Sequence, residues 1–284
     1  MRTFSRWMAL AVLAGGSAAY ADRNDIVVSK LGRPSGTTGN GNFEAFSRTL
    51  AAMVTSTSLT PPESLGHAGF AVNAELGVLS VPAGVYLPTE REQTGTVLVP
   101  SIHVRKGLPF SVDLGARVGW MDRSSLFAAT GEIRWAVNEG YIAWLPDIGV
   151  RLHATQVLNA RNVHLTATGL DASVGKQFPV GGMITLTPYG GIDLVGVSSR
   201  SDAIAFASGT GTLTQETYTK ASGLNSRFYA GGRFIGGALQ IGAEVSLATV
   251  GTVAAPRVDS TGAAVEAGVL PAVLAFNATL GLDF

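Results

Sequence analysis

The chain has 284 residues, of which 46% are hydrophobic and only 14% are charged, and its formal net charge is zero. This composition is too apolar for a disordered chain, and its 36 glycines are too many for a helical bundle. The balanced charge does not indicate a nucleic-acid partner, and the absence of cysteine excludes disulfides, thiolate metal sites and a cysteine nucleophile.

Residues 1–21 have the features of a signal peptide. Arg2 and Arg6 form a positively charged start, residues 7–13 form a short apolar core, and residues 19–21 have the small-x-small form of a cleavage site. We therefore predict a secreted precursor whose mature chain begins at Asp22. The alternative, an N-terminal anchor helix, needs a longer apolar core than this one.

Residues 22–67 are predicted to be a periplasmic lead-in with one amphipathic helix at about 43–55. The lead-in begins with Gly, Ser, Thr and Asn, Asn42 is expected to cap the helix, and Pro61-Pro62 follows it. We predict that the apolar face of the helix plugs the periplasmic mouth of the domain that follows, because a lone amphipathic helix must bury its stripe. A helix on the membrane surface is the alternative, although the polar face lacks the usual Lys and Arg. The stripe at helical spacing is Phe43, Phe46, Leu50 and Met53.

From residue 68 to residue 284 the apolar side chains alternate with polar ones, which is typical of half-exposed strands. No apolar run is long enough for a spanning helix, so any membrane span must consist of strands that close into a barrel. The fold class expected is all-β, an antiparallel up-and-down transmembrane β-barrel of about ten strands. Eight or twelve strands remain open if a weak segment fails or the lead-in adds a pair. The weakest segment is 166–177, because Thr166 and Thr168 stand in its apolar phase.

The connections between these segments alternate in length. Tight turns are expected near 106–109, 138–140, 179–182 and 236–237, and longer links near 80–94, 158–165, 198–222 and 250–271. Short periplasmic turns and long outer loops are usual in outer-membrane barrels, so both chain ends are predicted to be periplasmic. Pro100, Pro146 and Pro188 remove ladder donors, which predicts bulges or locally broken pairing.

Aromatic residues lie near the ends of the predicted strands on the outward face, as in membrane girdles. We therefore predict an outer-membrane location in a Gram-negative bacterium, with membrane lipid as a partner. The terminal aromatic, in phase with other apolar positions, resembles the signal read by the barrel-assembly machinery, a second predicted partner. The girdle residues are Phe110, Trp120, Phe127, Trp135, Trp144, Phe234 and Phe284.

The inward face is rich in charge for a chain with so few charged residues. Acids and arginines are nearly equal in number, which suggests pairs that fill a narrow interior, because an unpaired buried charge is costly. A narrow selective pore is the alternative interpretation. The predicted lumen charge network comprises Glu75, Arg105, Asp113, Arg117, Glu132, Arg134, Arg151, Asp171, Asp193, Arg227, Arg233 and Glu244.

One contact in this network can be predicted from a short link between two strands. If Asp122 and Phe127 close the hairpin, Arg117 stands directly opposite Glu132 and Arg134 lies diagonal to Asp113. Opposed residues have Cβ atoms about 4.5–5.5 Å apart, so a direct ion pair between Arg117 and Glu132 is expected.

Motifs for catalysis and for cofactors are weak. His164, in a predicted outer loop, could pair with Asp202 or Asp259 in a hydrolase, but spacing alone does not bring them together. The chain has no nucleophile elbow, no phosphate loop and no His-x-x-x-His spacing. We therefore expect no enzymatic activity, no cofactor and no metal.

Several short stretches carry a family resemblance. The chain resembles a group of uncharacterised proteobacterial outer-membrane β-barrel proteins in which a leader precedes an amphipathic helix, a Leu-Thr-Pro-like break and the barrel. The resemblance covers about 43–284 and implies architecture and location, with no functional residue and no established activity. The matching stretches are Leu59-Thr60-Pro61-Pro62-Glu63-Ser64-Leu65-Gly66, Gly69-Phe70-Ala71-Val72, Val104-Arg105-Lys106-Gly107-Leu108-Pro109-Phe110 and Thr187-Pro188-Tyr189-Gly190-Gly191-Ile192.

Three functions follow from this reading of the sequence. The first is a narrow channel or transporter for small polar or amphiphilic solutes. The second is a closed structural barrel whose outer loops or periplasmic segment bind a partner. The third is an outer-membrane hydrolase, which has the least support. Conductance in planar bilayers distinguishes the first two.

Overall fold

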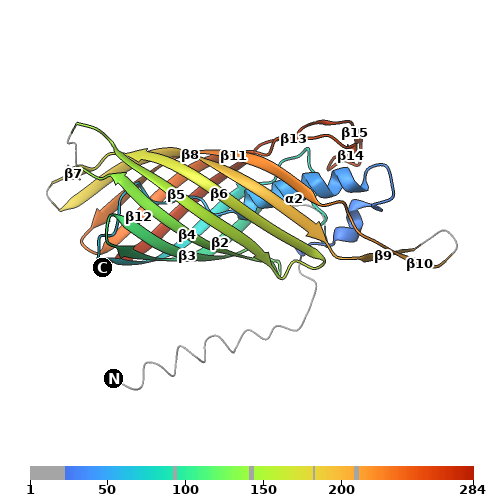
Figure 1. Cartoon of the computed structure of the whole chain (residues 1–284), viewed down its shortest axis with the longest axis horizontal. Coiled ribbons are helices and arrows are strands. Elements are labelled where there is room, and N and C mark those ends of the chain that lie inside the picture. The colour runs from blue at the N-terminus through green and yellow to red at the C-terminus, as the bar shows by residue number, and fades with distance from the viewer. Residues whose placement is uncertain (1–22, 92–94, 141–143, 182, 208–210) are drawn as a thin grey trace, which may run out of the picture.

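A computed structural model describes residues 23–91, 95–140, 144–181, 183–207 and 211–284. The predicted signal peptide, residues 1–21, lies outside the described residues. In the described part of the chain, ten long strands form one antiparallel barrel that closes where the last strand pairs with the first (Figure 1). The prediction of an up-and-down barrel of about ten strands is confirmed.

The barrel strands follow one another around the ring in chain order, with short accessory strands between some of them. The barrel strands are β1 (Phe70–Ser80), β2 (Thr96–Leu108), β3 (Val112–Trp120), β4 (Phe127–Asn138), β5 (Asp147–Leu158), β6 (Val163–Gly175), β8 (Ile184–Ser201), β11 (Ala221–Gly236), β12 (Leu239–Thr249) and β17 (Val273–Asp283). The accessory strands are β7 (Phe178–Val180), β9 (Ile204–Ala207), β10 (Leu213–Glu216), β13 (Thr252–Val253), β14 (Arg257–Val258), β15 (Ala264–Val265) and β16 (Gly268–Val269).

The two ends of the barrel differ. At the short-turn end lie the links β2–β3, β4–β5, β6–β8 and β11–β12, together with the start of β1 and the C-terminus. Phe70 and Phe284 exchange backbone hydrogen bonds there. At the long-loop end lie the links 81–95, 202–220 and 250–272, which carry the accessory hairpins (Figure 1). The expected longer link near 158–165 is wrong, because only residues 159–162 connect β5 and β6.

Alternation along the strands divides the wall into an outward apolar face and an inward face. β6 illustrates this, because every second residue from Val163 to Gly175 is buried and those between are exposed. The largest exposed apolar side chains on the wall include Ile102, Leu152 and Leu280, which are 62%, 55% and 54% exposed. Such a continuous exposed apolar surface is unfavourable in water and suits lipid.

Pro100 and Pro188, the prolines of the ten barrel strands, mark places where pairing is lost on one side. β2 pairs with β1 through Pro100, but its pairing with β3 begins only at Ser101. β8 pairs with β11 through Pro188, but its pairing with β6 reaches only Tyr189. Each proline therefore sits where its missing N–H interrupts one ladder only. Pro146 directly precedes β5.

The N-terminal segment lies inside the barrel. Among the described residues, no helix is long and apolar enough to cross a bilayer. A short 3₁₀ helix, η1 (Val28–Leu31), precedes α2 (Gly39–Val54), and both lie at the long-loop end (Figure 1). Residues 55–65, here called the lumen segment, then run to the short-turn end, where β1 starts. We call α2 and the lumen segment together the plug.

This path corrects the prediction that the lead-in and its helix lie at the mouth with the short turns, which was expected to be the periplasmic one. Asn24 donates a hydrogen bond to Asp122 O at 2.7 Å, and Arg33 pairs with Glu216, so the lead-in contacts the long-loop end. The helix also begins at Gly39, earlier than the predicted 43. Asn42 is not its cap, because Asn42 lies within the first turn of the helix and its side chain donates a hydrogen bond to Leu31 O.

The apolar core is the long-loop half of the lumen, where α2 meets inward side chains of the wall. Phe43 and Phe46 are fully buried there, with Leu165 and Val250 among their cluster. Gly41 allows a close approach, since a Cβ at this position would lie 2.1 Å from the Pro256 carbonyl oxygen. This explains why β6 looked weak in sequence: its inward residues at this level are apolar, and its outward ones are polar.

The outward face gives a direct test of the strand phase. Replacing Leu114, which is 44% exposed on β3, with Arg should lower the free energy of unfolding by about 2–4 kcal/mol, because the charge would face lipid. Leu213→Arg, on the accessory strand β10 at the long-loop end, is the matched control and should change it little. Urea unfolding in lipid vesicles measures both. A silent change at Leu114 would contradict the assignment of this face to lipid.

Candidate functional site

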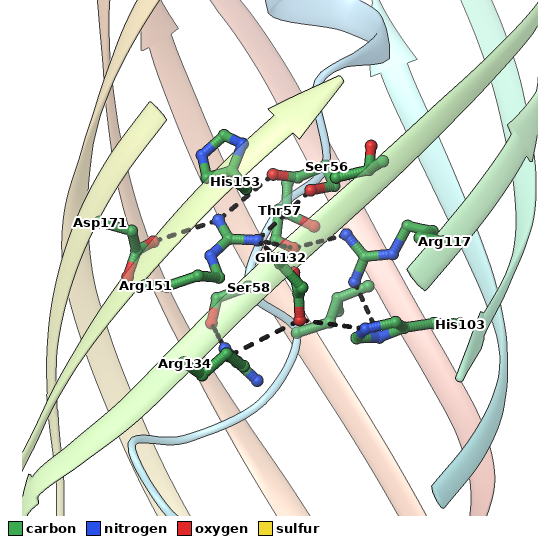
Figure 2. Close-up of polar contacts among 12 residues, drawn as sticks. Ser56, Thr57, Ser58, His103, Arg117, Glu132, Arg134, Arg151, His153 and Asp171 are labelled. Atoms are coloured by element: carbon green, nitrogen blue, oxygen red, sulfur yellow. Dashed lines mark hydrogen bonds and ion pairs between the residues drawn. The ribbon is translucent and has the colours of Figure 1, made fainter. Parts of the chain in front are cut away.

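All twelve members of the predicted charge network are buried inside the barrel. Arg105 and Arg151 are among its largest fully buried side chains, and Asp171 and Asp193 have no exposed surface. They come from nine different strands, because an inward position on each strand faces the same lumen. The structure therefore brings together residues that lie far apart in the sequence (Figure 2).

Four of the six arginines of this network bind the backbone of the plug. Figure 2 shows the lumen segment passing between Arg117, Arg134 and Arg151. Each arginine donates to at least one carbonyl oxygen, so the extended backbone keeps its hydrogen bonds although it is in no sheet. The contacts are Arg117 to Thr57 O at 2.7 Å, Arg134 to Thr60 O at 3.4 Å, and Arg151 to Ser56 O at 3.3 Å and to Thr57 O at 3.1 Å.

Arg227 binds the C-terminal end of α2. Its guanidinium donates to Ala52 O, Thr55 O and Ser56 O, each at 3.1 Å. The last carbonyls of a helix lack partners within the helix and carry the negative end of its dipole, so a buried cation stabilises them. The helix therefore ends against the most charged part of the lumen.

Carboxylates hold the arginines in place from the other side. Arg151 contacts Glu132 at 3.1 Å and Asp171 at 3.3 Å, and Arg117 contacts Glu75 at 2.7 Å. Arg227 contacts Asp193 at 3.4 Å. Each arginine thus satisfies both a wall carboxylate and the plug, which is the arrangement that makes buried charges tolerable.

His103 and His153 complete the charged layer. The two ring nitrogens of His103 lie 3.0 Å from Glu75 and 3.1 Å from Glu132, so this ring joins two carboxylates. His153 lies 2.9 Å from Asp193. Both rings are buried, and each extends the network around the barrel wall.

The predicted ion pair between Arg117 and Glu132 is wrong in register. β3 and β4 pair Trp120 with Phe127, so Arg117 stands opposite Thr130 and Glu132 stands opposite Gly115. The hairpin closes at Met121 and Leu126, both buried in the apolar core, and not at Asp122.

This two-residue shift leaves the same side chains of β3 and β4 pointing into the lumen. Arg134, expected to be diagonal to Asp113, is directly opposite it. The missing side chain of Gly115 leaves the space that Glu132 occupies, since a Cβ there would lie 2.6 Å from Glu132 Cγ. Glu132 is therefore free to contact Arg151 on β5, and Arg117 contacts Glu75 on β1.

The lower part of the lumen segment is fixed near the short-turn end. Glu63 pairs with Arg233. Asp113 accepts hydrogen bonds from Ser64 Oγ at 3.0 Å and from Leu65 N at 3.2 Å, and Arg105 lies 3.5 Å from the same carboxylate.

Glu244 differs from the other carboxylates of the network. Among the described residues no cation lies within 4.0 Å of it, and it accepts hydrogen bonds from Leu59 N at 2.9 Å and Tyr189 Oη at 3.1 Å. Leu59 has a φ of 51°, a left-handed conformation that is uncommon for this residue type. The carboxylate therefore marks the place where the plug backbone turns.

The predicted helix stripe lies within the barrel and not at its lower mouth. Phe43, Phe46, Leu50 and Met53 are all buried, and the Phe43 ring stacks on Tyr218 with centroids 4.8 Å apart. Arg48, on the opposite face of α2, donates to the Thr252 carbonyl at 2.7 Å. Both faces of the helix are therefore occupied by the barrel and its long loops.

The predicted girdle aromatics are all exposed on the outside of the barrel. Trp120 and Phe127 face each other at the long-loop end, 39% and 37% exposed. The others lie toward the short-turn end, and they are Phe110, Trp135, Trp144, Phe234 and Phe284.

A small cavity lies inside the lumen. This cavity, of about 50 Å³, lies beside the lumen segment, lined by Glu75, Ser101, Arg117 and Asn277 among others, and it has room for only a few water molecules. The described residues contain no group of three or more His, Asp or Glu side chains placed to hold a metal ion.

His164 and Asp202 are brought together, whereas Asp259 is elsewhere. His164 Nε2 lies 3.0 Å from Asp202 Oδ1, and both side chains are about half exposed at the long-loop end. Asp259 accepts hydrogen bonds within its own turn, from Thr261 and Ala263. Among the described residues the hydrogen-bond partner of the His164 side chain is Asp202.

Sequence reasoning missed the residues that receive the arginines. The run Thr55-Ser56-Thr57-Ser58 carries no recognisable motif, and the sequence assigns no role to Tyr189 or Tyr229. Tyr229 Oη donates to Asp171 at 2.8 Å. The sequence did carry one signal, a run of small polar residues in a chain whose inward strand positions are unusually charged. An extended backbone in the lumen needs hydrogen-bond donors, and buried arginines need acceptors.

Comparisons with known proteins return only distant structural similarity. No family model and no curated protein matches the chain. Neisserial surface protein A matches with 11% identity and a TM-score of 0.32, over 77% of this chain and 100% of that one. The translocator domain of the autotransporter NalP from Neisseria meningitidis matches with 13% identity and a TM-score of 0.35, over 77% and 89%.

A third match is the outer-membrane protein OprG from Pseudomonas aeruginosa, with 10% identity and a TM-score of 0.30, over 78% of this chain and 99% of that one. At this level of similarity none of these proteins informs the function of this chain. The barrel assignment rests on the closed strand pairing described above.

Proposed function

We propose that this chain is an integral β-barrel of the Gram-negative outer membrane that its own plug closes to solutes. In this proposal the short turns face the periplasm and the long loops face outward, as is usual for such barrels. The protein then acts at the cell surface through its long-loop end, and the barrel serves as a rigid base for that surface.

The observation that carries this proposal is the set of buried arginines that bind the plug backbone. Arg117, Arg151 and Arg227 each contact both a wall carboxylate and at least one plug carbonyl. Removing the plug would leave these charges without their backbone acceptors in a lumen of lowered dielectric, which is costly. The closed state is therefore the stable one.

The long-loop end offers the larger surface for a partner. The lead-in, the β9–β10 hairpin and the strands β13–β16 gather there (Figure 1). Arg33 of the lead-in pairs with Glu216 on β10, and Asn42 Oδ1 accepts from Val258 N at 2.6 Å. These contacts tie the β9–β10 hairpin to the lead-in and β14 to the plug.

Single-channel recording in planar bilayers tests the proposal. The full chain should give no conductance steps, whereas a variant that lacks residues 39–65 should give steps of uniform size. Heat-modifiable gel migration of the variant shows that its barrel is still folded. Steps of the same size from both proteins would overturn the closed-barrel proposal and support the channel.

A further inference from the structure

The wall of the barrel is unequal on its two sides at the long-loop end. β8 has 18 residues and β11 has 16, whereas β3 has 9, so the wall at β6, β8 and β11 extends farther. On β3 and β4 the last outward pair is Trp120 and Phe127. On β6, β8 and β11 the last outward residues are polar or charged, and this patch has no role in the closure of the lumen.

The outermost row of this patch is basic. His164 on β6 is paired directly with Arg200 on β8, and both are exposed. Lys220, also exposed, directly precedes Ala221, which pairs with Ser199 on β8. Continuation of this register puts Lys220 beside Arg200, so three adjacent strands each contribute a basic residue, at the sheet spacing of about 4.8 Å.

The next row toward the short-turn end consists of hydroxyls and an amide. Thr166 on β6 is paired with Ser198 on β8, and Ser198 is paired with Ser222 on β11. On the other side Thr166 is paired with Gln156 of β5, and Thr166 Oγ1 donates to Gln156 Oε1 at 2.6 Å. None of these outward side chains is buried.

Two rows farther toward the short-turn end the outward face is aliphatic on β5, β6 and β8, whereas β11 has Ser226 opposite Leu194. Thr168 is paired with Gly196, and the row after that pairs Leu170 with Leu194 and with Leu152. From Arg200 to Leu194 the face thus changes from cationic to hydroxyl to aliphatic over about 20 Å of strand. This is the order of groups in a lipid that carries phosphates on a sugar headgroup above its acyl chains.

The cations of the patch are available for a ligand. Among the described residues, neither Arg200, Lys220 nor the exposed Arg161 in the neighbouring β5–β6 turn forms an ion pair. Asp202 is engaged by His164 at 3.0 Å. The patch therefore has three permanent positive charges and one carboxylate. The same patch on a second copy of this chain would be repelled, whereas an anionic partner would be attracted.

We propose that these rows bind the phosphorylated sugar headgroup of an outer-leaflet glycolipid. Arg200 and Lys220, with Arg161, bind the phosphates, and Thr166, Ser198, Ser222 and Gln156 hydrogen-bond the sugar hydroxyls. The aliphatic row meets the acyl chains. The proposal rests on the orientation given under the proposed function, with the long-loop end outward, but it does not depend on whether the lumen is closed.

Native mass spectrometry of the full chain in nanodiscs tests this proposal. The nanodiscs contain either a phosphorylated lipid A-type glycolipid, the same glycolipid after enzymatic dephosphorylation, or phosphatidylglycerol. The protein variants are the wild type, Arg200→Gln with Lys220→Gln, Ser198→Ala with Ser222→Ala, and Arg123→Gln. Arg123, 61% exposed in the β3–β4 link, is the matched control on the opposite wall.

We expect the wild type and Arg123→Gln to retain the phosphorylated glycolipid at least about tenfold better than the dephosphorylated one or phosphatidylglycerol, because charge-assisted hydrogen bonds are lost without the phosphates. The Arg200/Lys220 variant should lose this preference, and the Ser198/Ser222 variant should lose part of it. Equal retention by the wild type and the Arg200/Lys220 variant, or an equal loss with Arg123→Gln, would overturn the proposal. So would retention of phosphatidylglycerol at the same level.

Inorganic phosphate provides the last arm of the experiment. Added at millimolar concentration, it should not displace the glycolipid, because it cannot use the hydroxyl and aliphatic rows. Displacement by phosphate alone would show a simple anion site and overturn the glycolipid assignment. The conductance of the Arg200/Lys220 variant should stay at zero, so a failure of the headgroup site and a failure of the closed barrel give different results.

Discussion

Replacing Arg151 with Leu should lower the free energy of unfolding by about 3–5 kcal/mol, the range seen when one partner of a buried ion pair is removed. The reason is the number of groups that depend on this side chain. It contacts Glu132 at 3.1 Å and Asp171 at 3.3 Å, and it donates to the carbonyls of Ser56 and Thr57. Urea unfolding in lipid vesicles measures the loss.

A double variant identifies the origin of this loss. Asp171 has no other cation within 4.0 Å among the described residues, so Arg151→Leu leaves it charged and unpaired. Adding Asp171→Asn should recover part of the stability, because the unpaired charge is then gone. Arg123→Leu, which removes an exposed ion pair, should cost less than about 1 kcal/mol. A change below that size for Arg151→Leu would contradict the structural role of the network.

Replacing Phe46 with Ala should loosen the plug while the barrel stays folded. Phe46 has no exposed surface, and truncation of a buried Phe costs about 3–5 kcal/mol. We expect this cost to appear in the docking of α2, because the ten-strand ring closes through β1 and β17 without it. Amide hydrogen exchange in α2 should therefore become faster by orders of magnitude, while exchange in β1 stays slow.

The matched control for this variant is Phe228→Ala on β11, where the ring is 51% exposed on the outward face. It should leave exchange in α2 unchanged. Brief conductance steps should accompany Phe46→Ala and not Phe228→Ala. If exchange in β1 rises together with exchange in α2, the plug and the barrel unfold as one unit, and the expectation that the plug loosens from a folded barrel is wrong.

The strand phases could be predicted from sequence because burial on one side of a barrel wall imposes a strict alternation. Leu114 and Val245 face outward and Glu132 and Arg134 face inward, as the alternation predicted. The register of β3 and β4 could not be predicted, because it depends on whether Leu126 turns toward the core. Leu126 packs in the apolar cluster around α2, which fixes the hairpin two residues away from the expected pairing.

The position of the plug was beyond sequence reasoning for a related physical reason. The amphipathic stripe of α2 showed that the helix must be buried but not at which end of the barrel. The deciding contacts are between backbone carbonyls of residues 52–60 and arginines from distant strands. Because every residue has a backbone carbonyl, the sequence does not indicate which carbonyls bind arginine. The outward Thr166 and Thr168 were likewise read as a defect of a strand, whereas they lie in the polar patch of the outer wall.

Cysteine labelling in intact cells tests the threaded, closed barrel most directly, because the chain has no cysteine of its own. Thr37→Cys lies at the long-loop end and His67→Cys at the short-turn end, and both positions are exposed. A membrane-impermeant maleimide should label Thr37→Cys in intact cells and His67→Cys only after the outer membrane is permeabilised. Labelling of His67→Cys from outside, or protection of Thr37→Cys until permeabilisation, would contradict a segment that crosses the lumen from the outer face.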